Sequence, residues 1–434
     1  MSSPLRHPLM GVVVAVLLSV PWVVVYAVSS PEAIGTVPTV AVSGLSVLGA
    51  SFLLAWGAET AEKDVPRAFA IAVLAILAVA PEYAVDAFYA WQAGQGRVGA
   101  GDLAVANMTG ANRILIGLGW SGIALFSIYR ATRSGDAAVE HNDGILADAV
   151  VLDRDIATEI LFLMLATLWA FFVPLGGGID TLDLVVLVGL YVVYIGIIIR
   201  GGADDGEVHV GVPAYLQKTP ANVRIPSIFA LFGYSGFLIF TAVEPFAHGL
   251  ENIGLQYGIP EFFMIQWVAP LASESPELIV TAYLVNKART TAAFNALISS
   301  KLNQWTLLIG TLGVVFSISQ GAYGVLEFSF KQSAEIWLTA AQSFFALAIL
   351  INFRITVREA VVLLVLFVSQ VGIEFLLIDT ISVGFTATDL LLAYTAVYLL
   401  LGSAMFVARF DNVRHVGSLA KTNVFADGQP ADSD

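Results

Sequence analysis

The sequence contains no cysteine among its 434 residues. Disulfide bonds, thiolate catalysis, iron–sulfur clusters and zinc–thiolate sites are therefore excluded. Only 12% of the residues are charged and 58% are hydrophobic, whereas a soluble domain carries about 25% charged residues. This composition excludes an ordinary cytosolic enzyme and a disordered protein, and it indicates a helical membrane protein.

Basic residues are also scarce, since 20 Lys and Arg are set against 34 Asp and Glu and give a formal net charge of -14. Such an acidic chain repels the phosphate backbone, so nucleic acid is not expected as a partner. The sequence shows no Walker A motif, and ATP is therefore not expected as a partner. No cofactor-binding domain is recognisable, so we expect no cofactor.

Apolar runs of about 20 residues dominate the chain, which is the length that a helix needs to cross a bilayer. A membrane β-barrel would show short alternating segments instead. The predicted fold is an all-α polytopic membrane protein with about twelve transmembrane helices. The predicted spans are Leu9–Val28, Pro38–Ala58, Ala68–Ala93, Leu103–Tyr129, Ile156–Leu175, Leu182–Ile199, Ile228–Gly249, Phe262–Val285, Ala293–Ser319, Ile336–Phe353, Val357–Ile378 and Leu390–Ala408.

The distribution of basic residues predicts the orientation. With both termini in the cytoplasm, 16 of the 20 Lys and Arg fall in cytoplasmic segments, and only Arg97 and Lys331 fall in outside loops. This asymmetry follows the positive-inside rule. The first span is also open to interpretation as a signal peptide, but its length favours a retained helix. No organelle presequence is recognisable, which favours a prokaryotic plasma membrane.

A short motif occurs twice. Residues 81–88 read PEYAVDAF and residues 276–283 read PELIVTAY. The two copies lie five predicted spans apart and therefore face in opposite directions, which is typical of the inverted repeats of secondary transporters. Each is followed in the next span by a polar interruption, at 106–113 and 295–304. A proline inside a helix frees a carbonyl, and a freed carbonyl beside a carboxylate suits a hard cation.

The repeat also predicts how the chain is organised. Two five-helix units, related by inversion, form the core, and one extra helix precedes and one follows them. The predicted segments are an N-terminal helix (1–33), a first repeat (34–200), a short cytoplasmic linker (201–225), a second repeat (226–380) and a C-terminal helix with an acidic tail (381–434).

These paired motifs resemble the cation/calcium antiporter superfamily, the group of sodium/calcium exchangers. Each family repeat carries G-T-S-x-P-E on one helix and G-S-N-hydrophobic-x-[ND] on the next, and the resemblance covers the ten central helices. It implies that Glu82 and Glu277 are the glutamates that bind the metal ion, which would be Ca²⁺. The further candidate ion ligands are Ser273, Ser300, Gln304 and Asn112 at family positions, together with Glu274, which replaces a family Ser.

The sequence also departs from the family pattern. Ala78–Val79, Ala111 and Leu115 stand where the first repeat of the family has polar side chains. In the second repeat Lys301 replaces the family Asn, and Arg113 adds a cation to the first. The resemblance therefore indicates a divergent member in which residues at the sodium-binding positions of the family are replaced.

Several charges lie at membrane depth, where they are costly and usually paired or functional. If all are ionised, Asp86 and the three central glutamates exceed Arg113 and Lys301 by two negative charges. That excess equals the charge of one Ca²⁺, two Na⁺ or two protons. We hypothesise that Arg113 and Lys301 permanently occupy places that sodium ions fill in other exchangers. Alternatively, they are structural clamps that hold the broken helices.

Other carboxylates are assigned weaker roles. Asp86 is equally consistent with a solvated charge near the outer mouth. Glu159, Glu244 and Glu374 are expected to have structural or vestibule roles. The two Pro-Glu motifs are also open to a structural interpretation, as helix kinks whose carboxylates form buried ion pairs.

The predicted function is secondary active antiport of cations by alternating access, with the ion bound between the two repeats. The resemblance implies sodium/calcium exchange. The alternatives are proton-coupled exchange of calcium or sodium, since a buried carboxyl group can give up its proton when a cation arrives, and a transport-dead ion-binding membrane protein. An intramembrane protease is disfavoured because no catalytic motif is present. The expected partners are the lipid bilayer and small inorganic cations.

Overall fold

The computed structural model describes residues 7–65, 80–134, 136–144, 146–200, 209–377 and 386–425. The chain divides into two compact units: unit 1 comprises Met1–Tyr89 and Ala203–Pro276, and unit 2 comprises Ala90–Gly202 and Glu277–Asp434. The boundaries between them fall inside helix α5 (Ala80–Gly94) and helix α13 (Glu261–Asn286). These are the two helices that carry the Pro-Glu motifs.

Ten helical stretches among the described residues are long and apolar enough to cross a membrane. They are Met10–Val28, Thr36–Ala61, Ala100–Ala131, Ala157–Gly176, Thr181–Arg200, Ala221–Tyr257, Thr290–Gln320, Phe330–Leu350, Val357–Leu376 and Ala387–Ala408. The predicted all-α polytopic membrane fold is confirmed. Helices α5 and α13 are not among these ten, so the twelve-span layout stays a prediction. Most of the first half of the predicted third span, including Ala78 and Val79, lies outside the described residues.

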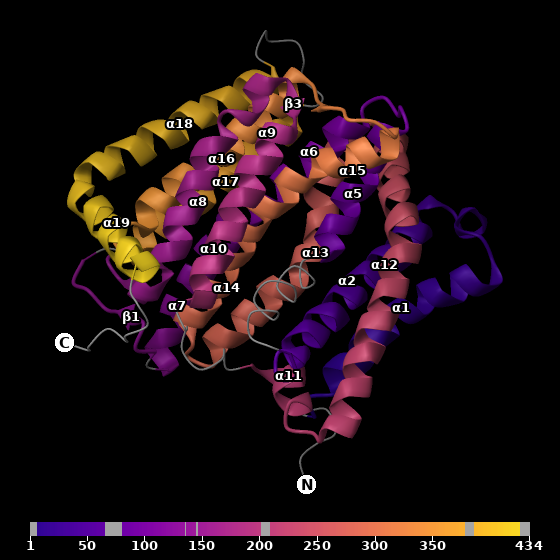
Figure 1. The fold of residues 1–434 in the computed structure, drawn as a ribbon, viewed down its shortest axis with the longest axis horizontal. Helices are drawn as coiled ribbons and strands as arrows, with labels where there is room; N and C mark the ends of the chain where they lie inside the picture. Colours follow the sequence, from indigo (N-terminus) through magenta and orange to yellow (C-terminus); the bar gives the residue numbers. More distant parts are fainter. Residues whose placement is uncertain are drawn as a thin grey trace. The chain divides into compact units, whose positions relative to one another are not determined.

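Unit 1 is built on three long helices that pack against one another. They are α1 (Met10–Val28), α2 (Thr36–Ala61) and α12 (Ala221–Tyr257), accompanied by the short helices η2 (Pro31–Ile34) and α11 (Gly211–Leu216) (Figure 1). A Cβ at Gly49 of α2 would lie 2.5 Å from the Ala15 carbonyl oxygen of α1, so glycine permits this close approach. The hydroxyl of Ser51 donates to the Val47 carbonyl of its own helix at 2.9 Å, which satisfies it without water.

Residues 209–224 of the predicted linker contact the C-terminal end of α2 and the residues after it through charged groups. His209 lies 3.4 Å from a Glu59 carboxylate oxygen and 2.8 Å from one of Glu62. Burial alone would lower the pKa of His209, but the hydrogen bonds and charges of these two glutamates raise it to about 10. Arg224 donates two hydrogen bonds of 2.6 Å to Asp64, which lower the pKa of that carboxyl group. Helix α12 begins at Ala221, several residues before the predicted span.

Unit 2 holds most of the remaining helices. Its α-helices are α6 (Ala100–Ile114), α7 (Ser121–Ser134), α8 (Ala157–Ala170), α9 (Thr181–Asp183), α10 (Gly189–Arg200), α14 (Thr290–Asn303), α15 (Ile309–Gln320), α16 (Phe330–Leu350), α17 (Val357–Leu377), α18 (Ala387–Ala408) and α19 (Phe410–Phe425). Wider π-helical turns form η4 (Leu115–Trp120), η7 (Leu184–Val188) and η8 (Gln304–Leu308), and tighter 3-10 turns form η5 (Arg154–Ile156) and η6 (Val173–Gly176). The turn η4 begins two residues after the polar interruption at 106–113, and η8 begins at the last residue of the interruption at 295–304. Such π-bulges are frequent at functional sites.

Helix α16 forms the core of unit 2, where it packs against α6, α8 and α18. Of its most apolar 18-residue stretch, 89% is buried. It nevertheless carries buried polar side chains, among them Glu335 and Gln342. The helix begins at Phe330 rather than at the predicted Ile336, so Lys331 lies in its first turn and not in a loop as predicted.

Short strands connect the helices of unit 2, and the sequence did not predict them. Strands β1 (Val139–Glu140), β2 (Ala149–Val151) and β5 (Arg354–Thr356) form an antiparallel sheet in the order β1-β2-β5. Strands β3 (Gly178–Ile179) and β4 (Leu326–Glu327) form a second antiparallel pair.

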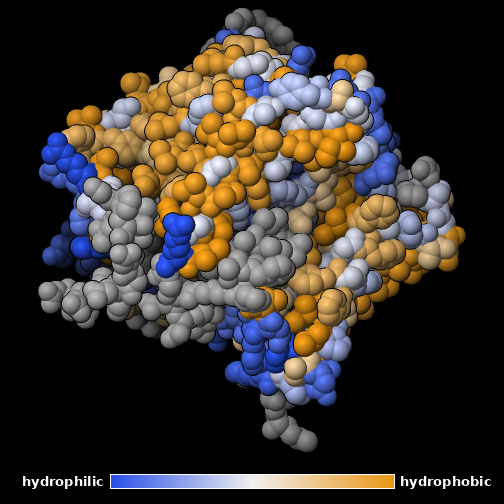
Figure 2. All heavy atoms as spheres, viewed as in Figure 1, coloured by the Kyte–Doolittle hydropathy of each residue, from blue (hydrophilic) through white to orange (hydrophobic). Residues whose placement is uncertain are grey.

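Large apolar side chains cover much of the surface seen in Figure 2. Phe240 of α12 is 87% exposed, and Leu376 of α17 is 68% exposed. Such side chains are stable against lipid and unfavourable in water. The surface therefore agrees with the membrane environment that the hydropathy of the spans indicates.

Candidate ion-binding site

Unit 1 brings together carboxyl groups from both Pro-Glu helices. Glu82 lies in the first described turn of α5 and is 2% exposed. The Ser273 hydroxyl of α13 donates to Glu82 Oε2 at 3.3 Å, and Glu274, which is 3% exposed, lies within hydrogen-bonding reach of Glu82. Asp86 follows one turn later on α5 and is fully buried, so it is not a solvated charge. Three buried carboxyl groups therefore share one region of unit 1.

A cluster of buried carboxyl groups needs a positive charge to balance it. Two ionised carboxylates in a low-dielectric site repel each other strongly, so a bound proton or a bound cation must balance them. Their oxygens, together with the Ser273 hydroxyl, are the hard ligands that Ca²⁺ prefers. The cluster can therefore hold either a proton or a cation.

The second motif glutamate lies in unit 2. The Ser300 hydroxyl of α14 donates to Glu277 Oε2 at 2.8 Å. Glu277 is half-buried, whereas Ser300 and Gln304, the first residue of η8, are buried. This arrangement brings together a carboxylate from α13 and a hydroxyl from α14, with an amide oxygen in the π-helical turn η8 that follows α14.

Lys301 and Asn112 meet directly inside unit 2. Lys301 Nζ donates to Asn112 Oδ1 at 2.9 Å and to the Asn112 carbonyl oxygen at 3.4 Å. The ammonium also lies 4.2 Å from the centre of the Trp305 ring, a cation–π distance. Both side chains are fully buried. In the predicted motifs these two residues hold the same position of the first and the second repeat.

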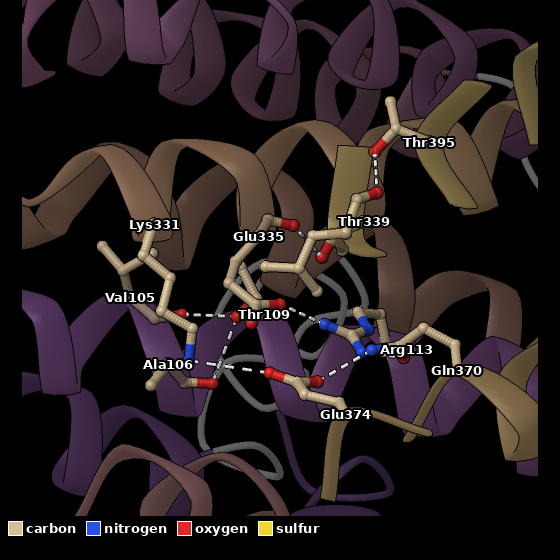
Figure 3. A network of polar contacts seen from close by, with 11 residues as sticks. Val105, Ala106, Thr109, Arg113, Lys331, Glu335, Thr339, Gln370, Glu374 and Thr395 are labelled. Atoms are coloured by element: carbon tan, nitrogen blue, oxygen red, sulfur yellow. Dashed lines mark hydrogen bonds and ion pairs between the residues drawn. The ribbon is translucent and has the colours of Figure 1, made fainter. Parts of the chain in front are cut away.

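Arg113 belongs to a different network, drawn in Figure 3. It donates to Glu335 Oε2 of α16 and to Gln370 Oε1 of α17. Gln370 in turn donates to Glu374 at 2.8 Å, and Lys331 Nζ lies 3.6 Å from the other oxygen of Glu374. If all four ionisable groups are charged, two cations balance two anions. Arg113 and Glu335 form an ion pair, and both side chains are buried.

The structure thus places most of the predicted residues in three groups. The first, in unit 1, contains Glu82, Asp86, Ser273 and Glu274. The second and third lie in unit 2: Glu277 contacts Ser300, near Gln304 in the chain, and Asn112 contacts Lys301. Arg113 pairs with Glu335 of α16.

Sequence reasoning missed Glu335 and Gln370, and it did not group Glu374 with them. Glu374 is fully buried, whereas Glu244 is exposed. A signal was present, because Lys331 and Glu335 lie four residues apart and Gln370 and Glu374 have the same spacing. Placing the start of the tenth span at Ile336 put Lys331 and Glu335 outside the membrane and concealed it.

The fold and the buried polar clusters define a polytopic helical transporter, and comparisons with known proteins identify its family. The family model for sodium/calcium exchanger proteins matches residues 35–200 and 227–376. The chain therefore belongs to the sodium/calcium exchanger family. It is a secondary transporter that handles cations, not an enzyme.

Solved structures give a finer comparison. The chain is 41% identical to a protein whose structure is described as the H⁺/Ca²⁺ exchanger CAX, over 96% of this chain and 98% of that one, with a TM-score of 0.84. The structure of native YfkE is 17% identical, covers 86% of this chain and 100% of its own, and has a TM-score of 0.55, which shows a shared fold. The search of curated proteins found no match.

Proposed function

We propose that this protein exchanges Ca²⁺ for H⁺ across a prokaryotic plasma membrane. The observation that carries this proposal is the buried pair of Glu82 and Glu274. Two carboxyl groups hydrogen-bond to each other only when one of them holds a proton. A cation that binds both oxygens removes the need for that proton and releases it, which couples the two ions at one place.

The similarity to CAX supports the same choice of ions. The identity of 41% extends over nearly the whole of both chains, and that protein is an exchanger of H⁺ and Ca²⁺. Sodium coupling is the alternative that the name of the matching family supports. We favour H⁺ because Lys301 occupies a position where the family motif has Asn.

The described contacts suggest a role for each residue. Glu82 and Glu277 are the proposed carboxylate ligands of Ca²⁺, and the hydroxyls of Ser273 and Ser300 each lie within hydrogen-bonding distance of one of them. Glu274 is the proposed partner that shares the proton with Glu82. The Gln304 amide is a further proposed ligand. Asn112 is assigned a different role from the predicted one, since its Oδ1 accepts from Lys301.

Flux in reconstituted vesicles tests this function. Vesicles that are acidic inside are expected to take up ⁴⁵Ca²⁺, and Na⁺-loaded vesicles without a pH gradient are expected not to. In Glu82→Gln and in Glu277→Gln we expect uptake to fall by at least about 100-fold, because even second-shell changes around a bound metal cost 10- to 100-fold.

Glu327→Gln serves as the matched control, because the Glu327 side chain is exposed and lies in strand β4. This variant should keep wild-type uptake. Uptake that responds to Na⁺ and ignores the pH gradient would contradict proton coupling and restore sodium/calcium exchange. Calcium binding without flux under either gradient would indicate the transport-dead alternative.

A further inference from the structure

One buried glutamine of unit 1 has no part in the contacts described so far. Gln266 lies in α13, and its side chain is fully buried. Neither its amide oxygen nor its amide nitrogen has a hydrogen-bond partner among the residues that the structure describes. Burying an unpaired amide costs free energy, and polar groups inside the membrane often mark the path of a transported ion. Gln266 is therefore a candidate ligand outside the carboxyl cluster.

Gln266 lies on the same face of α13 as an ion-site residue. Ser273, whose hydroxyl donates to Glu82 at 3.3 Å, follows Gln266 by seven residues. Seven residues make almost two full turns, so the two side chains leave the helix within about 20° of each other and about 10 Å apart along its axis. Val268 and Leu271 are exposed and mark a different face of the helix.

A proline gives Gln266 a second available oxygen. In an uninterrupted helix its backbone carbonyl would accept a hydrogen bond from the amide four residues later. That residue is Pro270, which has no N–H to donate. Carbonyl and amide oxygens are ligands that Ca²⁺ accepts beside carboxylates. One buried residue can therefore offer the ion two neutral oxygens.

The first half of α13 and the second half of α5 lie against the same part of α12. The rings of Phe88 in α5 and His248 in α12 have centroids 5.4 Å apart. A Cβ at Gly254 of α12 would lie 3.4 Å from the Met264 side chain of α13. Moving forward along α5 and backward along α13 from the carboxyl cluster therefore leads to the same end of unit 1.

Asp86 lies between the carboxyl cluster and that end. It follows Glu82 by one turn, about 6 Å along α5, and is fully buried. Gln266 lies about 10 Å from Ser273 in the same direction. Helix α5 continues to the loop that holds Val98, so we name this side of the membrane the Val98 face. A cation that moves from Glu82 to the Val98 face passes first the level of Asp86 and then that of Gln266.

We propose that Gln266 binds Ca²⁺ at a second position, between the carboxyl cluster and the Val98 face, through its amide oxygen and its backbone carbonyl. Asp86 supplies negative charge between this position and Glu82. The ion exchanges part of its water shell there before it reaches the carboxylates, and it recovers water there when it leaves. Two adjacent positions allow an ion to bind and still be released. The inference rests on the proposed function, because it describes the route of the same Ca²⁺ ion.

Transport kinetics measured from the two faces test this position. Gln266→Leu removes the amide and leaves an apolar side chain of similar size. For Ca²⁺ added at the Val98 face, we expect KM to rise about tenfold with kcat unchanged, since changes around a bound metal ion cost about 10- to 100-fold. For Ca²⁺ added at the opposite face, KM should stay unchanged and kcat should fall by a similar factor, because the ion then leaves through the altered position.

Uptake of ⁴⁵Ca²⁺ into membrane vesicles of both orientations, under a fixed pH gradient, measures these constants. Maleimide labelling of Val98→Cys identifies the orientation of each preparation. A purely structural role of Gln266 would change KM and kcat in the same way at both faces. If Gln266→Leu does not fold, Gln266→Met replaces it in this experiment.

Gln266→Glu tests binding without transport. A carboxylate binds Ca²⁺ more strongly than an amide does. This variant should therefore bind one more Ca²⁺ per protein than the wild type. Equilibrium dialysis of the purified full-length protein against ⁴⁵Ca²⁺ measures the difference.

The matched control is Gln342→Leu. Gln342 of α16 is 1% exposed, and both atoms of its amide also lack a hydrogen-bond partner among the described residues. The variant loses the same kind of buried group from unit 2. It should leave KM and kcat unchanged at both faces.

Three outcomes would overturn the inference: an equal change of KM at both faces in Gln266→Leu, the same kinetic pattern in Gln342→Leu, or no additional Ca²⁺ in Gln266→Glu. Failure of the proposed function is a separate result, in which the wild type takes up Ca²⁺ without responding to a pH gradient. If protons drive uptake in the wild type and Gln266→Leu keeps wild-type kinetics at both faces, the function stands and the inference fails.

Discussion

At the scale of single residues, the most constrained feature is the buried ion pair of Arg113 and Glu335. Removing an arginine and a carboxylate from water costs several kcal/mol, and their attraction offsets that cost only if the geometry is good and the remaining groups are hydrogen-bonded. Gln370 accepts a further hydrogen bond from Arg113. The pair therefore joins α6 to α16 inside unit 2.

Replacing one member of this pair should destabilise the protein far more than replacing both members. Glu335→Gln leaves an unbalanced guanidinium in the core, and we expect it to destabilise the protein by about 3–5 kcal/mol. The double variant with Arg113→Gln should recover much of this loss, since two amides remain. Unfolding of the purified protein in detergent measures both. A double variant that is less stable than Glu335→Gln alone would refute this interpretation of the pair.

At the scale of elements, the docked linker depends on the protonated state of His209. The folded pKa of about 10 lies above the ordinary value of 6.5. Stability from this group is therefore fully present below about pH 6.5 and is lost as the pH rises through about 10. At about 1.4 kcal/mol for each pKa unit, the contribution has an upper bound of about 5 kcal/mol.

His209→Gln should remove that dependence. We expect the wild type to lose stability between pH 7 and pH 11 by more than the variant does, while the variant is less stable at pH 7. Thermal unfolding across this pH range, at constant salt, measures the difference. Parallel profiles for the two proteins would show that His209 does not contribute to folding through its charge.

The positions of the helices followed from hydropathy, because a bilayer requires long apolar stretches with internally paired backbones. Helix α1 begins one residue after the predicted Leu9 and ends at the predicted Val28. The start of α16 was not predicted, since its first turn is polar and hydropathy does not distinguish a polar turn inside protein from a loop. The short strands were missed because two or three residues carry no detectable period.

The sequence predicted the residues of the candidate site in part, as it did the helices. The Pro-Glu motifs led to Glu82 and Glu277, and the structure gives both of them serine partners on neighbouring segments. The sequence shows which charges lie at membrane depth, but it does not show which side chain each one faces. Glu335 therefore escaped notice, and the charge of Arg113 was counted against the carboxyl groups of the motif helices and not against Glu335.

At the scale of the whole molecule, the orientation in the membrane stays a prediction, and the lack of cysteine makes it easy to test. We expect Val98→Cys, in the loop between α5 and α6, to react with a membrane-impermeant maleimide on intact cells. Val98 is 98% exposed. Asn142→Cys, between β1 and β2, should react only after permeabilisation. The opposite pattern would place the termini outside.

The contact between Asn112 and Lys301 has a consequence for the sequence changes that the chain tolerates. The two residues lie 189 positions apart, yet the oxygens of one accept from the ammonium of the other. A substitution at either position therefore changes what the other position requires. A lysine in place of Asn112 would repel Lys301, whereas an aspartate would attract it. These two positions should consequently vary together among relatives, as residues in contact do.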